Sequence, residues 1–70
     1  MIDSSEAVEI ARTAASDLGH AIEELRVATV VTREQTCEVL FTDDRYARGG
    51  GIQVEVDMVT GLVTGATPQL

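Results

Sequence analysis

The sequence predicts an α+β fold in which one N-terminal helix packs on an antiparallel sheet of three to four strands. Three observations support this fold class. Residues 3–18 place apolar side chains at helical spacing, whereas residues 24–32 and 36–43 alternate and are rich in β-branched residues. Residues 51–63, GIQVEVDMVTGLV, form an alternating strand that runs into a turn. A chain of 70 residues has room for a single domain, 1–70, and for no second core.

Residues 3–18 are expected to form an amphipathic helix. The side chain of Asp3 or Ser4 can accept hydrogen bonds from the free amides of the first turn, and Gly19 can end the helix in a left-handed conformation. At about 100° per residue, Arg12 falls on the polar side. The other side carries a stripe of mostly small apolar residues: Ala7, Val8, Ile10, Ala11, Ala14, Ala15 and Leu18. Alanine side chains bury little apolar area, so the helix is not stable alone and needs a sheet to pack on.

The first two strands are expected at residues 24–32 and 36–43, and the loop between them sets their register. A two-residue turn at 34–35 would place Cys37, Val39 and Phe41 beside Thr32, Val30 and Ala28. A three-residue loop at 33–35 would place them beside Val31, Thr29 and Val27, with Leu25 extending the same face. A one-residue slip turns every side chain over. We favour the three-residue loop because it gathers more polar residues on the opposite face.

The third strand is expected at residues 51–58, with Ile52, Val54 and Val56 inward and Gln53 and Glu55 outward. After it, the carboxylate of Asp57 can accept hydrogen bonds from backbone amides two residues on, and Gly61 can adopt a positive φ. These residues predict a turn followed by a short last strand at 62–64. Gly65 and Pro68 are expected to end the ordered chain, with frayed residues beyond.

Residues 43–50, DDRYARGG, form the most irregular segment of the chain. One interpretation is a plain connection between the second and third strands. The other is a contact loop, because tyrosine and arginine are favoured as anchors at protein interfaces. The candidate partner-binding residues are Asp44, Arg45, Tyr46 and Arg48. The glycines 49–51 match no phosphate-binding motif, since no lysine and no helix start follow them.

Charge restricts the class of partner. Twelve acidic residues stand against five arginines, so the net charge is −7. Binding to nucleic acid needs a basic surface, and anionic membranes also select basic segments; we therefore expect no direct nucleic-acid or membrane partner. An acidic surface suits solubility, a basic protein partner or mimicry of nucleic-acid charge. No apolar run is long enough to span a membrane and the first residues do not resemble a signal peptide, so a cytoplasmic location is expected.

No catalytic, cofactor or metal site is predicted. Cys37 lies within a strand on its apolar face, where it reads as a small buried hydrophobic residue, and no disulfide is possible within the chain because it is the only cysteine. His20 follows the helix end, where an exposed or capping role is expected. Asp43, Asp44 and Asp57 could offer oxygen ligands to a hard cation, but they lack the spacing of a calcium loop.

The order of a helix, a hairpin and a closing strand resembles the PepSY family. The residues that carry the resemblance are the closing segment Asp57-Met58-Val59-Thr60-Gly61-Leu62-Val63 and the helical alanines Ala7, Ala11, Ala14 and Ala15. PepSY domains pack one N-terminal helix on an antiparallel sheet, carry no catalytic residues and are associated with binding and restraining proteases. The closing strand with its preceding glycines also looks like that of some bacterial immunity proteins.

The sequence thus predicts a non-enzymatic protein-binding or regulatory module of PepSY-like type that restrains a protease or associates with itself as a homodimer. The alternative is an acidic inhibitor or immunity protein that blocks a basic nuclease or nucleic-acid-binding partner. In either case the expected working surface is the 43–50 loop, an edge strand, or the sheet face turned away from the helix.

Overall fold

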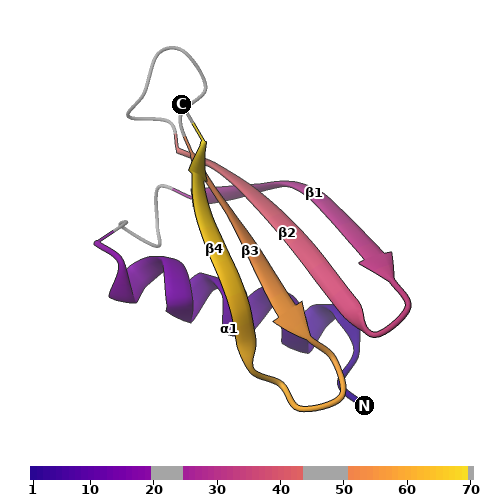
Figure 1. The fold of residues 1–70 in the computed structure, drawn as a ribbon. Coiled ribbons are helices and arrows are strands. Elements are labelled where there is room, and N and C mark those ends of the chain that lie inside the picture. The colour runs from indigo at the N-terminus through magenta and orange to yellow at the C-terminus, as the bar shows by residue number, and fades with distance from the viewer. Residues whose placement is uncertain (20–24, 44–50, 70) are drawn as a thin grey trace.

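The protein is one helix followed by a four-stranded antiparallel sheet, as expected from its sequence (Figure 1). The computed structural model describes residues 1–19, 25–43 and 51–69. Its elements are α1 (Ser4–Asp17), β1 (Leu25–Arg33), β2 (Thr36–Asp43), β3 (Gly51–Asp57) and β4 (Val63–Gln69). The strands lie in chain order, β1-β2-β3-β4, so β1 and β4 form the two edges. The helix covers one face of this sheet.

The ends of α1 follow the capping pattern of the sequence. The backbone amide of Glu6 donates a 2.9 Å hydrogen bond to the Asp3 carboxylate, and Gly19 has a φ of +100° just beyond the last turn. Ala7, Ala11 and Ala15 are fully buried, because small side chains let the helix backbone lie close to the sheet. Leu18 was expected in the apolar stripe, but it is 60% exposed. It follows the last helical residue as the C-cap, and its side chain lies outside the core.

Arg12 does not belong to the polar side of the helix, contrary to the wheel argument. Its guanidinium carbon lies 5.5 Å from the centroid of the Phe41 ring, and its Nη1 donates a hydrogen bond of 3.4 Å to the carbonyl oxygen of Leu25. A long arginine stem can run along apolar surface while its charged end reaches a polar partner. Arg12 therefore ties α1 to β1 and β2.

Alternate residues of the two central strands form the core. Cys37, Val39 and Phe41 of β2 are fully buried, and Ile52, Val54 and Val56 of β3 lie directly beside them in the ladder. This confirms the inward faces predicted for both strands. Leu25 and Met58 close the core at its margins.

The turn between β1 and β2 has two residues, and our preference for three was wrong. Thr32 pairs with Cys37 and Arg33 with Thr36, which leaves Glu34 and Gln35 as the turn. Glu34 has a φ of +51°, the positive value that a tight hairpin turn requires at its first central position. Glu34 itself adopts the positive φ, so this two-residue turn forms without a glycine.

A β-bulge at Ala28 explains why both registers had support in the sequence. Val27 pairs with Phe41 and Thr29 pairs with Leu40, so Ala28 is the extra residue of β1. On the turn side of the bulge the strand follows the two-residue register. On the other side the bulge shifts the pairing by one residue, and Leu25 returns to the buried face.

The turn after β3 has the hydrogen bonds that its sequence predicts. The Asp57 carboxylate accepts a 2.8 Å hydrogen bond from the amide of Val59 and one of 3.3 Å from that of Thr60, and Gly61 has a φ of +75°. The amide of Met58 also donates to the carbonyl of Gln35 at 2.7 Å. This bond joins the β1–β2 turn to the β3–β4 turn at one end of the sheet.

The last strand is longer than expected. β4 runs from Val63 to Gln69, whereas the sequence suggested that it would end at residue 64. Its ladder passes through a bulge at Thr64, since Val56 pairs with Val63 and Glu55 with Gly65. Pro68 pairs with Ile52. A proline can belong to a ladder at a sheet edge, because an edge strand uses only half of its amides.

Candidate functional site

The sheet face turned away from α1, here called the open face, is the candidate site. Across the described ranges the only helix, α1, lies on the other side of the sheet, and no element packs on this face (Figure 1). Successive side chains of a strand point to opposite faces of the sheet. The residues that alternate with the buried ones therefore lie on the open face, and each strand contributes some of them. The open face includes the side chains of Thr29, Val31, Glu38, Leu40, Gln53 and Glu55.

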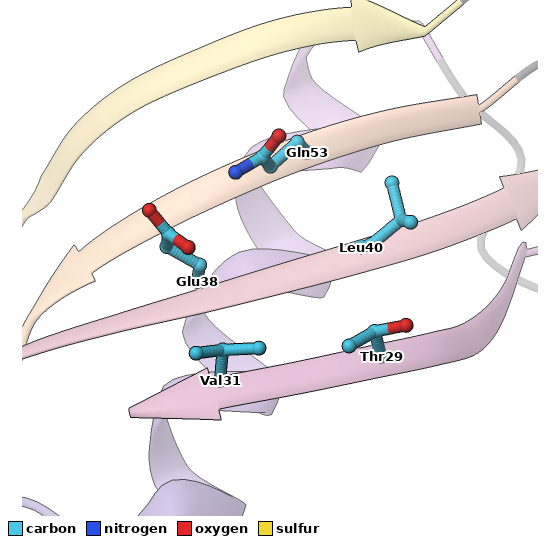
Figure 2. A pocket seen from close by; sticks show the side chains of 5 residues that line it. All are labelled: Thr29, Val31, Glu38, Leu40 and Gln53. Carbon is cyan, nitrogen blue, oxygen red and sulfur yellow. The ribbon is translucent and has the colours of Figure 1, made fainter. Parts of the chain in front are cut away.

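A shallow hollow of about 140 Å³ lies near the middle of the open face. Figure 2 shows its lining side chains standing on the side away from the helix: Thr29 and Val31 from β1, Glu38 and Leu40 from β2, and Gln53 from β3. Leu40 has direct neighbours on both sides, since the ladder pairs it with Thr29 and with Gln53. Leu40 and Val31 are half-buried, and they give the hollow an apolar character within a polar rim.

Two carboxylates face each other beside this hollow. Glu38 of β2 and Glu55 of β3 are direct partners in the ladder, so their side chains rise from adjacent positions on the open face. Like charges directly opposite each other in a sheet are destabilising. Arg33 only partly balances this pair, because its Nε lies 4.0 Å from the Glu38 carboxylate and its side chain is 72% exposed. A cation supplied by a partner would find two carboxylates placed side by side.

A second depression lies between α1 and β4, away from the open face. It has a volume of about 330 Å³, and its lining includes Ile10, Ala14, Leu62 and Val63. Leu62 is 65% exposed and belongs to the turn that leads into β4.

The residues expected to bind a partner are not among those that the structure describes. Asp44, Arg45, Tyr46 and Arg48 fall in the 44–50 range, and His20 falls in the 20–24 range, both outside the described residues. The contact-loop interpretation therefore stays a prediction. The sequence did suggest the open face in general terms, but it missed the hollow. Its lining depends on the register between β1 and β2, which the sequence argument assigned incorrectly.

The chemistry available in the described part of the chain is limited. Cys37 is a free thiol and fully buried in the core. Within residues 1–19, 25–43 and 51–69, no group of three or more histidine, cysteine or acidic side chains could hold a metal ion. No described helix is long and apolar enough to cross a membrane. The open face instead offers hydroxyl, amide, carboxylate and apolar groups, which suit non-covalent recognition.

Comparison of the chain with protein-family models, with curated proteins and with solved structures finds no match.

Proposed function

We propose that this protein is a non-enzymatic protein-binding module whose recognition surface is the open face of its sheet. The observation that carries the proposal is the partly apolar hollow around Leu40 in the middle of a sheet face that no described element covers. An antiparallel sheet can leave one face in water, but a wholly solvated face is normally polar. Val31 and Leu40 depart from that pattern at the centre of the face.

The size of the hollow favours a protein over a small molecule. Pockets that enclose small ligands usually hold about 300 to 1,000 Å³, whereas this hollow holds about 140 Å³. That volume suits one apolar side chain of a partner. Protein interfaces commonly have an apolar centre and a polar rim, and their strongest contacts place an anchor residue in such a recess. Thr29, Glu38 and Gln53 supply the rim here.

The PepSY resemblance suggests a protease as the first class of partner to test. The closing Asp57–Val63 segment carries that resemblance, and PepSY domains are associated with restraining proteases. A regulatory module of this kind needs no reactive group of its own. Its action would be to occupy a surface of the enzyme with a rigid sheet.

A basic partner is the second candidate, and the Glu38–Glu55 pair favours it. The two carboxylates lie opposite each other on the open face, and the whole chain carries a net charge of −7. An arginine or lysine of a nuclease or nucleic-acid-binding protein would relieve their repulsion. Because such charges mainly steer association, the association rate should fall steeply as salt shortens the Debye length from about 30 Å at 0.01 M to about 8 Å at 0.15 M. An association rate that salt does not change would exclude this candidate.

The test of the open face is affinity capture with matched variants. Leu40→Arg puts a charge into the hollow, whereas Val59→Arg puts the same charge on the 51% exposed Val59 of the β3–β4 turn. We expect a set of proteins that the unaltered chain and Val59→Arg retain and that Leu40→Arg loses. Circular dichroism of each variant checks that the fold is kept. Equal retention by Leu40→Arg and Val59→Arg would contradict the proposal.

A further inference from the structure

The two edge strands of the sheet, with which no other described strand pairs on the outer side, differ in how readily another strand can pair with them. Natural proteins protect edge strands with proline, bulges and charges. β4 has Pro68, Gly65 and a bulge at Thr64 within seven residues. β1, with the sequence LRVATVVTR, contains no proline and no glycine, and its bulge at Ala28 leaves the segment Thr29–Arg33 regular. Although β1 also has a bulge and two arginines, its segment Thr29–Arg33 is the more regular of the two edges and the less protected one.

We infer that a second copy of this chain pairs antiparallel with the free edge of β1, about a two-fold axis at Val31. This inference is independent of what the open face binds. It would join two sheets into one of eight strands, with both helices on the same side.

Among the ways in which two copies could meet, the β1 edge brings the fewest acidic side chains together. The chain carries a net charge of −7, and acids lie on α1, β2 and β3. Two copies that met through the helix or the open face would bring these acids together. β1 has two arginines, Arg26 and Arg33, and no acid. β4 also lacks acids, but its proline and bulge protect it, so β1 alone combines an acid-free edge with a regular one among the described strands.

The side chains of β1 are also incompletely covered. Val27 and Val30 lie on the helix side of the sheet, opposite Phe41 and Val39, and are each 38% exposed, because α1 packs least against β1. A domain of this size has little core to stabilise it, and association is a common remedy. A second β1 strand alongside would shield Val30 on its open flank.

The register follows from the hairpin. A tight two-residue turn closes on a hydrogen-bonded pair, here Arg33 and Thr36. Hydrogen-bonded and non-hydrogen-bonded pairs alternate along an antiparallel ladder, so Thr32 and Val30 direct their amide and carbonyl groups outward. The centre of the regular segment is Val31. When two copies meet there antiparallel, Val30 of each faces Thr32 of the other, and all the outward groups of these residues find partners.

The same register brings the two Val31 residues opposite each other as a non-hydrogen-bonded pair on the open face. Such pairs have the shortest separation between strands, and β-branched pairs at these positions are stabilising. Val31 lines the hollow with Leu40. Pairing of two copies would therefore place the two hollows side by side across the join.

Cysteine cross-linking tests this register. A non-hydrogen-bonded pair separates its Cα atoms by about 4.5 Å, and disulfides span about 4.4 to 6.8 Å. We expect Val31→Cys to form a disulfide-linked dimer under mild oxidation. Val63→Cys is the matched control on the other edge, since Val63 is 39% exposed. Thr29→Cys controls the register, because residue 29 would face Arg33 of the second copy. The native Cys37 is fully buried and should not react.

The unaltered protein provides the second readout. Light scattering across a dilution series should give twice the 7.5 kDa mass of the chain, falling to the single mass on dilution. Val30→Pro removes an outward amide that β2 does not use, so the variant should keep its circular dichroism spectrum and lose the dimer. If Val30→Pro unfolds, Val31→Lys replaces it, because that lysine lies beside Glu38 within one copy and opposite its counterpart in the dimer.

Three results would overturn the inference. The first is a monomer mass at every concentration. The second is a cross-link that forms through Val63→Cys or Thr29→Cys and not through Val31→Cys. The third is a dimer that both Val30→Pro and Val31→Lys leave unchanged while they keep the fold.

Discussion

The two faces of the sheet are built from alternate residues of the same strands, yet they meet different surroundings. In β2, Cys37, Val39 and Phe41 are fully buried beneath α1, whereas Glu38 and Leu40, which alternate with them, are only half-buried. The covered face is close-packed, so its side chains determine whether the chain folds. The open face contributes less to folding, and its composition is therefore freer to serve recognition. Substitutions on the two faces should separate these roles.

The largest expected effect comes from the neighbours Phe41 and Leu40. Phe41→Ala should lower the free energy of unfolding by about 3 to 5 kcal/mol, because it leaves a cavity beneath the helix. Leu40→Ala on the open face should lower it by about 1 kcal/mol, since its side chain is only partly removed from water. Urea denaturation measures both values, with Phe41→Leu as the volume-conserving control. Equal losses for the two alanine variants would remove the distinction between the faces.

A second effect on stability tests how closely the backbones of β2 and β3 approach each other at Gly51. A Cβ atom on Gly51 would overlap the backbone carbonyl oxygen of Phe41, whereas one on Gly65 would only touch the Glu55 side chain, at 4.0 Å. We expect Gly51→Ala to lower the free energy of unfolding by about 1 to 3 kcal/mol. Gly65→Ala should leave it unchanged or raise it by about 0.4 to 1 kcal/mol. Thermal unfolding compares the two variants, and an equally stable Gly51→Ala would refute the predicted overlap.

A smaller effect on stability is expected where Arg12 of α1 contacts the covered face. Arg12→Met keeps the apolar stem but loses the hydrogen bond to Leu25 and the contact with the Phe41 ring. The free energy of unfolding should fall by about 1 kcal/mol. Arg33→Met is the control, because its pairing with Glu38 is long and exposed and should contribute little. Urea titrations in which the two variants lose equal stability would show that Arg12 does not tie α1 to the sheet.

The smallest effect has the opposite sign. Glu55→Gln removes one of the two facing carboxylates from the open face. Stability should rise by about 0.2 to 1 kcal/mol, since like charges opposite each other in a ladder are unfavourable. Chemical denaturation at low and high salt measures the gain, which should shrink as salt screens the pair. A gain that is the same at both salt concentrations would have a cause other than charge.

How well the sequence predicts which side chains face inward differs from strand to strand. For β2 and β3 it identified every inward residue, because both strands are central and their alternation reports burial directly. β1 is an edge strand that the helix covers incompletely, so apolar residues such as Val27 and Val30 remain partly exposed and pattern no longer indicates facing. The bulge at Ala28 then reverses the pattern midway. The candidate hollow was missed for the same reason, since two of its lining residues come from β1.

The local features of this protein can be predicted from its sequence alone. The Asp3 cap, the alanine stripe, the alternation of the two central strands and the Asp57–Gly61 turn all follow from contacts within a few residues. The tertiary structure determines the two-residue turn, the bulges and the length of β4. These depend on which residues lie opposite each other across strands, and pairing energy there outweighs the local tendency of Gly65 and Pro68 to end a strand. The open face is the product of both, because alternation selects its side chains and register brings them together.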